Sequence, residues 1–299
     1  MRGLMTMVGL VAVAGLAGGF TAAKPAAQEK TYDLRGPAPA KGQTFLSTST
    51  MKIKDADTTL KVMGQTVNVK ATIDMTGEEE ETVLAVDGRN VTKSQARIVK
   101  ERAEITTDFG GMNNSQTMPS ELEGEVVISE RVGEGKWKHS LVDTRPTDKQ
   151  KKELDTRNGI ENDDDLFPAD KVPVGHTWTV EAKALTKMFG NSFQDIKGDI
   201  KQKFVKVETL DGEEVAVIES TGSVKAKMKD EDGEPTMDVE MTDLKITGWR
   251  SLKTGVTVKE KFEGKFKMSG TQKQDDMKIE ITLSGPFTGE GTTKIKEKK

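Results

Sequence analysis

The feature of this sequence that most constrains its fold is a regular alternation of apolar and polar residues along unusually long segments. Between residues 67 and 75 every second side chain is apolar, and residues 256–268 and 277–283 alternate in a similar way. Successive side chains of a β-strand point to opposite faces, so this period predicts strands with one buried face. Further strands are expected at 44–54, 82–87, 122–130, 137–143, 177–185, 199–209, 214–228 and 236–249.

The length of these strands restricts the architecture further. Ten or more residues at ~3.3 Å each span roughly 30–40 Å, and a flat sheet of that size with one apolar face would pair with other chains. The sheets must therefore curl over a core, a helix or a ligand. We predict a mostly β fold, with long curved antiparallel sheets in two related, half-barrel-like halves and one short linker helix. The turns expected between strands include Gly77, Asp87-Gly88, Asp211-Gly212 and Ser269-Gly270.

The linker helix is the clearest helical signal in the chain. Thr147 and Gln150, which follow Pro146, have the spacing of a capping box and predict a helix over 147–156. Residues 91–107 fit either a short helix or a strand. In the segment 236–249 the apolar face changes phase between Met241 and Leu244, which predicts a bulge or a bend.

A weak internal repeat divides the chain into two parts. Lys41-Gly-Gln-Thr-Phe45 reappears as Val174-Gly-His-Thr-Trp178, 133 residues later, and each phrase opens a predicted strand. Two related β units explain this spacing, with a chance match as the alternative. The expected segments are a signal peptide (1–23), a flexible leader (24–40), an N-terminal β unit (41–145), a linker with the short helix (146–173), a C-terminal β unit (174–290) and a basic tail (291–299).

The first 23 residues have the pattern of a secretory signal peptide. Arg2 is followed by an uncharged, mostly apolar run and by small residues up to Ala23. We expect cleavage near Ala23 and a periplasmic or extracellular protein, the alternative being that the segment stays as an anchor.

The chain has no cysteine, which excludes disulfides and the acylated cysteine of bacterial lipoproteins. No other segment is apolar enough to span a membrane, and the formal net charge of −4 argues against nucleic-acid binding.

Two phrases resemble an uncharacterised family of exported bacterial proteins, a domain of unknown function. Leu166-Phe-Pro-Ala-Asp-Lys-Val-Pro-Val-Gly-His-Thr-Trp178 is similar to the family's linker, in which a Leu-Pro…Val-x-x-Gly-x-x-Trp phrase joins two β halves. Gly248-Trp-Arg-Ser-Leu-Lys-Thr-Gly-Val256 resembles a later phrase of the family. The resemblance covers about residues 41–290. It implies an architecture similar to curved-sheet carriers of the lipoprotein-localisation type, and it supplies no catalytic residues.

The sequence lacks the common catalytic patterns. Without cysteine there is no thiol nucleophile, and there is no Gly-x-Ser-x-Gly, dinucleotide-binding, Walker or His-Glu-x-x-His motif. The two histidines, His139 and His176, lie in predicted strands, and we expect neither to act as a base or a metal ligand. We therefore expect no enzymatic activity and no cofactor.

Acidic clusters are the remaining polar candidates. Residues 78–81, 161–165 and 230–234 are rich in Glu and Asp, and we expect the first and last at hairpin turns. Carboxylates can bind calcium, but none of these clusters has the spacing of a calcium-binding loop. Solvated turns are the favoured interpretation. The weak calcium candidates are Asp163, Asp164 and Asp165.

Methionine is the most suggestive apolar residue, because several methionines fall on the apolar faces of predicted strands. They either fill an ordinary core or line an adaptable pocket for a lipid or another apolar ligand. The leading hypothesis is an exported soluble protein that binds such a ligand in the cell envelope. The alternative is a structural or interaction protein of the envelope with a packed core and no ligand. The candidate ligand-binding residues are Met237, Val239, Met241, Val258, Phe262, Phe266, Met268, Ile279 and Ile281.

Overall fold

The computed structural model describes residues 30–189, 193–229, 235–274 and 277–296, and the predicted signal peptide lies outside them. The protein is mostly β, as predicted, with 71% of its residues in strands and 7% in helices. The strands are β1 (Thr31–Tyr32), β2 (Thr44–Val62), β3 (Gln65–Asp87), β4 (Asn90–Phe109), β5 (Met112–Pro119), β6 (Val126–Gly133), β7 (Lys136–Leu141), β8 (Val172–Pro173), β9 (Thr177–Glu181), β10 (Phe193–Leu210), β11 (Glu213–Lys229), β12 (Pro235–Ser251), β13 (Thr257–Gln274) and β14 (Met277–Lys296). The helices are α2 (Asp148–Thr156), the 3-10 helix η1 (Asp164–Leu166) and α3 (Ala182–Phe189).

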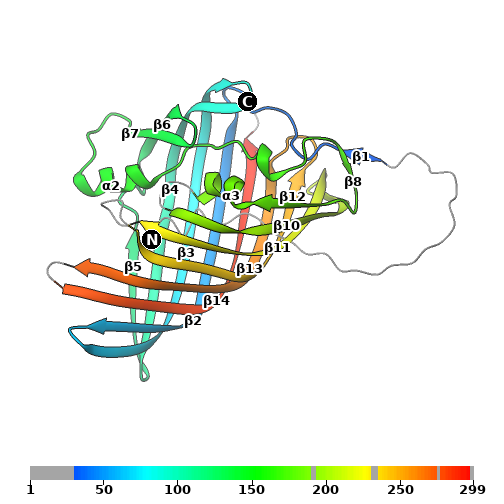
Figure 1. Cartoon of the computed structure of the whole chain (residues 1–299). Coiled ribbons are helices and arrows are strands. Elements are labelled where there is room, and N and C mark those ends of the chain that lie inside the picture. Colours follow the sequence, from blue (N-terminus) through cyan, green and yellow to red (C-terminus); the bar gives the residue numbers. More distant parts are fainter. Residues whose placement is uncertain (1–29, 190–192, 230–234, 275–276, 297–299) are drawn as a thin grey trace, which may run out of the picture.

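Twelve of the strands form one antiparallel sheet. Its order is β7-β6-β4-β3-β2-β14-β13-β12-β11-β10-β9, and β5 pairs with β4 beside β6. The N-terminal half supplies β2 to β7 and the C-terminal half supplies β9 to β14. The halves meet where β14 pairs with β2 along nearly its whole length (Figure 1). The two halves that the sequence indicates therefore share a continuous sheet, and β1 and β8 form a separate two-stranded sheet.

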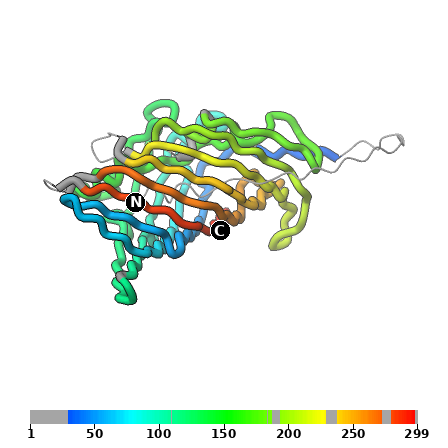
Figure 2. Tube along the Cα trace, turned by 60° about the horizontal axis from the view of Figure 1, so that its bottom comes forward, coloured from blue at the N-terminus to red at the C-terminus, as the bar shows by residue number. Residues whose placement is uncertain are grey.

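The long strands curve into an open trough, and α3 and the linker lie on its inner side (Figures 1 and 2). Asp55 in β2, Asp195 in β10 and Asp243 in β12 each have a positive φ at a shift of the strand register. Aspartate tolerates this backbone conformation better than most residues, and a bulge bends its strand. The bulge at Asp243 is the one predicted between Met241 and Leu244.

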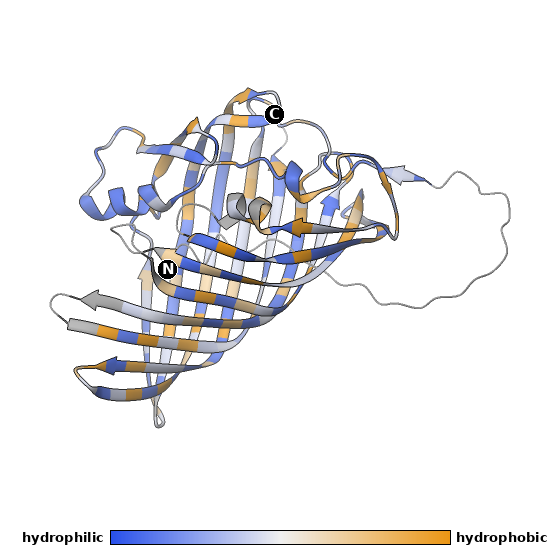
Figure 3. Ribbon diagram, viewed as in Figure 1, coloured by the Kyte–Doolittle hydropathy of each residue, from blue (hydrophilic) through white to orange (hydrophobic). Residues whose placement is uncertain are grey.

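The main hydrophobic cluster lies on the inner face of the sheet. Ile53, Met75 and Phe262 pack there with Leu185 of α3 and Phe167 of the linker. Apolar and polar residues alternate visibly along the strands (Figure 3), which is the pattern expected for a sheet with one buried face. Because both halves contribute residues, the trough has one main core that they share.

The linker helix is confirmed, and a second helix is new. Thr147 caps α2: its side chain accepts a hydrogen bond from the Gln150 N–H at 3.2 Å, and the Gln150 side chain accepts one from the Thr147 N–H at 2.9 Å. The strand predicted over 177–185 ends at residue 181, and α3 begins at the next residue. Apolar residues recur in α3 at helical spacing, but the segment is too short for this period to stand out.

Several predicted turns are wrong because the strands are longer than expected. Gly77 and residues 78–81 lie inside β3, and Ser269-Gly270 lies inside β13. The turn between β2 and β3 is instead Met63-Gly64, where both residues have positive φ. The ambiguous segment 91–107 belongs to strand β4.

The terminal segments are more ordered than predicted. In the supposed flexible leader, Leu34 is 1% exposed, and the Arg35 guanidinium donates a hydrogen bond to the Phe167 carbonyl at 3.1 Å. Residues 291–296 of the predicted basic tail form the end of β14. Lys296 there forms an ion pair of 2.9 Å with Glu80.

The two repeated phrases adopt the same main-chain arrangement. The Gly42 N–H donates to the Val83 carbonyl at 2.7 Å, and the Gly175 N–H donates to the Phe204 carbonyl at 2.6 Å. In both places the partner residue returns a hydrogen bond of 2.9 Å to the carbonyl of the residue after the glycine. Both glycines have positive φ, which explains why glycine stands at this point of each phrase.

Candidate functional site

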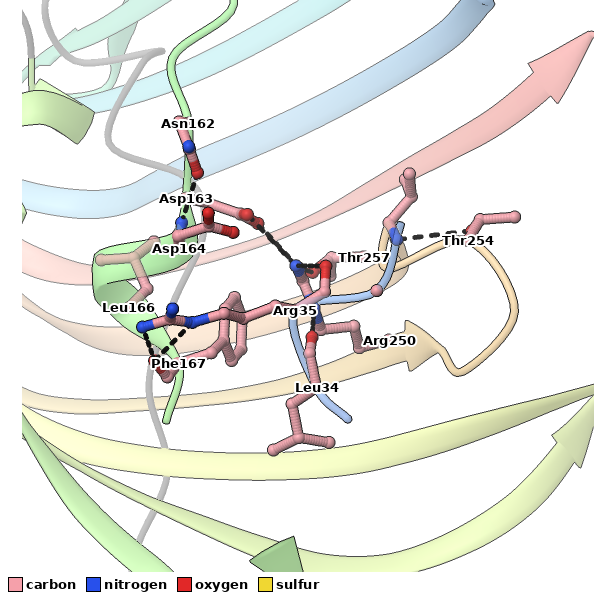
Figure 4. Close-up of polar contacts among 12 residues, drawn as sticks. Leu34, Arg35, Asn162, Asp163, Asp164, Leu166, Phe167, Arg250, Thr254 and Thr257 are labelled. Atoms are coloured by element: carbon pink, nitrogen blue, oxygen red, sulfur yellow. Dashed lines mark hydrogen bonds and ion pairs between the residues drawn. The ribbon is translucent and has the colours of Figure 1, made fainter. Parts of the chain in front are cut away.

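A buried arginine ties the linker to the sheet. Arg250 of β12 is 1% exposed. Its guanidinium donates to both carboxylate oxygens of Asp163, at 2.7 and 3.1 Å, and to the carbonyl of Leu34 (Figure 4). Its Cζ atom lies 3.8 Å from the ring centroid of Phe167. Bidentate pairs of this kind are among the stronger charged contacts, so Arg250 joins the N-terminal segment, the linker and β12.

Further ion pairs extend this network along the linker. They join Arg89 to Asp164, Arg131 to Glu161, and Arg157 to both Glu79 and Glu101. Burial acts to raise the pKa of Asp164, but hydrogen bonds from Arg89 and Asn162 outweigh it and hold that pKa below its usual value. The linker is thus fastened to strands of both halves by charged side chains.

The acidic cluster at 161–165 is part of this network rather than a solvated turn. Asp163 and Asp164 direct their carboxylates at guanidinium groups, and Asp165 lies in η1. In the described ranges, no group of three or more acidic or histidine side chains is placed to hold a metal ion. An oxygen bonded to a guanidinium has less capacity for a cation, so the structure adds no support for calcium at this cluster. The cluster at 230–234 lies outside the described residues.

The structure places the predicted ligand-binding residues in two environments. The packed ones are Val239, Met241, Phe262 and Phe266 of the main cluster, Met268 at its border, and Met237, which is buried beside it. Val258, Ile279 and Ile281 keep part of their surface accessible. Core filling therefore accounts for the first group, whereas the second group keeps accessible surface on the inner face.

Beyond the packed cluster, toward the β2–β3 and β13–β14 hairpins, the inner face stays apolar but is less covered. The strand register aligns Met237, Gly270, Ile281, Leu60 and Val67 in one row across five strands. Met237 is 7% exposed at one end of the row, and Val67 is 42% exposed at the other. Contiguous exposed apolar side chains often mark interaction sites. This row, called the open row below, is a part of the inner face where apolar side chains keep accessible surface.

A glutamate interrupts the apolar inner face in β13. Glu260 stands in phase with Phe262 and Phe266, and it lies over Gly291, where a Cβ atom would sit 2.7 Å from its Oε1. Protein surrounds the carboxyl group on nearly all sides, although the residue keeps some accessible surface. No hydrogen bond or ion pair reaches Glu260 from the described residues. Burial raises its pKa to about 8.

A second perturbed carboxyl group lies in β3. The Ser94 hydroxyl donates a hydrogen bond of 2.6 Å to Glu81. Burial and then the nearby charge of Glu79 raise the pKa of Glu81 to about 7, although the Ser94 hydrogen bond and the Arg157 charge oppose the shift. A carboxyl group that stays protonated near neutral pH can donate a hydrogen bond as well as accept one.

The amide of Gln202 is the most buried unpartnered polar group among the described residues. Gln202 of β10 is 1% exposed, and neither its Nε2 nor its Oε1 has a hydrogen-bond partner. The register places it between Trp178 of β9 and Ser220 of β11. An unpartnered buried amide costs about 1–3 kcal/mol, so this site can accept a polar group that the chain does not supply.

Glu260 and Gln202 do not appear among the sequence-predicted site residues, and Glu81 appears only within the acidic cluster 78–81, although the sequence contains a signal for all three. Each stands at a position where the alternation of its strand calls for an apolar residue. Glu260, for example, falls between Val258 and Phe262. Buried polar groups of this kind can therefore be predicted by looking for a polar residue at a position where the alternation of a strand calls for an apolar one.

The two histidines have different environments. His139 of β7 shares a hydrogen bond of 2.9 Å with Ser129, and its other ring nitrogen lies 3.0 Å from the Arg157 carbonyl. Burial, helped by the positive charge of Arg157, lowers the pKa of His139 to about 4. His176 stacks on Trp178 with ring centroids 5.9 Å apart. A neutral, hydrogen-bonded His139 has a structural role in β6–β7.

No family model matches this sequence, and no curated protein matches it. Among solved structures, the chain is similar to a DUF1329 family protein from Desulfovibrio piger, with 11% identity, 85% of this chain and 84% of that chain covered, and a TM-score of 0.19. It is also similar to the COG4313 outer membrane channel from Pseudomonas putida F1, with 7% identity, coverage of 87% and 97%, and a TM-score of 0.26.

A third likeness is to a domain described as an outer membrane lipoprotein-sorting protein from Vibrio parahaemolyticus, with 9% identity, 87% of each chain covered and a TM-score of 0.14. TM-scores this low do not establish a shared fold. None of the helices in the described residues has the length and apolar character needed to cross a membrane.

Proposed function

We propose that this chain is an exported binding protein of the cell envelope, without catalytic activity, that holds the apolar part of a lipid or similar ligand on the inner face of its trough. The open row carries this proposal. It continues the main core toward the hairpins, and its side chains become more exposed from Met237 to Val67. A ligand laid along this row would extend the core and bury apolar surface worth about 25 cal/mol per Å².

The polar groups of the inner face favour a long ligand with a polar end, because Glu260 stands ten residues before Gly270 of the open row in β13, roughly 33 Å along the strand. Gln202 has no partner within the described residues, and Glu260 has none either. Amphiphilic ligands combine a large apolar surface with a few hydrogen-bonding groups, and binding sites for them are lined accordingly.

A second candidate function is a structural or interaction protein of the envelope with no ligand. The dense packing of α3, the linker and the sheet in the main cluster favours this candidate, because side chains of the chain itself already fill that part of the trough. The two candidates differ in whether anything covers the open row in the native protein.

Lipid analysis of the native protein separates the candidates. The protein is purified from its source envelope without detergent, extracted with organic solvent, and the extract is analysed by mass spectrometry. A co-purified amphiphile near one mole per mole of protein supports the binding function. An extract with no ligand near that ratio favours the interaction protein.

A matched pair of variants tests the location. Val67→Glu places a charge on the open row, whereas Leu46→Glu places one on the outer face of β2, and the two wild-type side chains are 42% and 37% exposed. Binding of the neutral fluorescent probe N-phenyl-1-naphthylamine should weaken at least tenfold in Val67→Glu and stay within twofold in Leu46→Glu. Equal effects of the two changes would place the ligand elsewhere.

A further inference from the structure

Strand β5 is an edge strand that contains no charged residue, and its one proline, Pro119, stands at its last position. It pairs only with β4 among the described strands, and all eight of its residues are exposed. Met112 is 74% exposed and Met118 is 39% exposed. The β4–β5 hairpin projects beyond the neighbouring strands in both views (Figures 1 and 2). Its free main-chain groups are therefore accessible to another strand.

The two outermost strands of the sheet, β7 and β9, are protected. Strand β7 carries Lys136 and Lys138, and lysines discourage edge pairing. Strand β9 has five residues and leads directly into α3, which packs on β9 and β10. By contrast, residues 110–119 contain no charge in a chain of which 31% of the residues are charged. Strand β5 therefore lacks the charged side chains that protect β7.

The sequence of β5 is a chemical palindrome about Ser115. Residues 112–118 read Met-Asn-Asn-Ser-Gln-Thr-Met. When this strand pairs antiparallel with itself about Ser115, Met112 faces Met118 and Asn114 faces Gln116, and Ser115 faces its own copy. Directly opposed residues of an antiparallel pair point to the same side and interact. Self-pairing thus matches apolar with apolar and amide with amide, with no like charges opposed.

The main chain of β5 is compatible with the same register. Phe109 pairs with Met112 across the turn Gly110-Gly111, and the pair that closes a two-residue turn exchanges its hydrogen bonds. The odd-numbered residues of β5 consequently turn their N–H and C=O groups outward. A register centred on Ser115 opposes odd residues with odd residues, so about six intermolecular main-chain hydrogen bonds can form.

We infer that β5 is a dimerisation strand, which pairs antiparallel with β5 of a second copy of this chain and joins the two sheets into one. The pairing is symmetric, as expected for a two-fold contact between identical chains. It leaves the inner face of each trough unobstructed at the open row of β12 to β3, so it is independent of ligand binding.

Sedimentation velocity of the purified exported protein from 1 to 100 µM tests this inference. We expect a concentration-dependent dimer in the wild type. Ser115→Pro removes an outward N–H that β4 does not use, so it should leave the fold intact and abolish the dimer. Ser115→Lys opposes two positive charges and should weaken dimerisation at least tenfold, whereas Thr288→Lys, on an exposed position of the central strand β14, should not change it.

Cross-linking gives an independent readout, because the chain has no cysteine. Ser115→Cys should form a disulfide between two copies under mild oxidation, and Thr288→Cys should not. The inference is overturned by a wild-type protein that stays monomeric throughout the range, or by a Ser115→Pro dimer as stable as the wild type. A photo-cross-linker at position 115 that captures a different envelope protein instead of a second copy would overturn it as well.

Discussion

The linker and the inner face of the trough differ in how their polar side chains are partnered: acidic residues of the linker are paired with arginines, whereas two buried polar groups of the inner face have no partner in the part of the chain that the structure describes. Asp163 meets Arg250, and Asp164 meets Arg89. On the inner face, Glu260 and Gln202 have no partner among the described residues. A carboxylate paired with an arginine stays ionised and fastens two segments together, whereas burial without a charged partner favours the neutral form. The paired groups hold the fold together, and the unpaired ones belong to the ligand site that we propose.

The largest effect is expected where a partnered group loses its arginine. Arg250→Met leaves the Asp163 carboxylate and the Leu34 carbonyl without their donor, and we expect a loss of about 3 kcal/mol in the free energy of unfolding. Because the Asp163 side chain remains 45% exposed, we expect a loss at the lower end of the range seen when buried ion pairs are broken. Urea unfolding at pH 7 measures it. A loss below 1 kcal/mol would mean that the network does not hold the linker.

The next effect concerns the pH dependence of Glu260. In the unfolded chain its carboxyl ionises near pH 4.5, whereas in the folded chain it keeps its proton up to about pH 8. The folded state thus binds the extra proton between these values, and its stability falls as the pH rises through this window. Glu260→Gln stays neutral, so we expect it to exceed the wild type by on the order of 1–2 kcal/mol at pH 9. The accessible surface of Glu260 limits the gain.

Urea unfolding of the wild type and Glu260→Gln at pH 5, 7 and 9 measures this difference. Glu81→Gln provides a comparison, because burial raises the pKa of Glu81 to about 7. The stability difference between Glu81→Gln and the wild type should therefore stop changing above about pH 7. Parallel stability profiles for the wild type and Glu260→Gln would show that Glu260 ionises normally in the folded protein.

A smaller effect is expected at Gln202. Gln202→Met replaces the unpartnered amide by an apolar side chain of similar length, and we expect the free energy of unfolding to rise by about 1 kcal/mol. The variant should also weaken binding of an amphiphile if the amide contacts its polar end. Thermal and urea unfolding of ligand-free protein measure the stability. Destabilisation of the ligand-free protein would show that the amide already has a partner, such as a buried water.

The smallest effect is expected at an exposed ion pair. Lys265 and Asp243 form a contact of 2.7 Å on the outer face, with side chains 72% and 63% exposed. Lys265→Gln should change the free energy of unfolding by less than about 0.5 kcal/mol. This variant is the control for Arg250→Met, because both remove one cation from an ion pair and differ in burial. If Lys265→Gln lowered the free energy of unfolding as much as Arg250→Met does, burial would not explain the large effect expected at Arg250.

Features that depend on neighbouring residues could be predicted from the sequence. The alternation identified the β class, the phase change identified the bulge at Asp243, and the spacing of Thr147 and Gln150 identified the start of α2. Predictions failed where a local pattern was ambiguous: Gly77 resembles a turn residue but lies inside β3. The acidic residues at 161–165 were expected in solvent because their arginine partners lie far away in the chain.

By itself, the sequence determined that the chain forms long two-faced strands and which side chains share a face, because strand periodicity is a property of consecutive residues. Only the tertiary structure decided that β14 pairs with β2 and that Arg250 meets a carbonyl 216 residues away, at Leu34. Those contacts depend on how the whole sheet is ordered and curved. For the same reason, only the structure distinguishes the carboxyl groups that have a partner from those that do not.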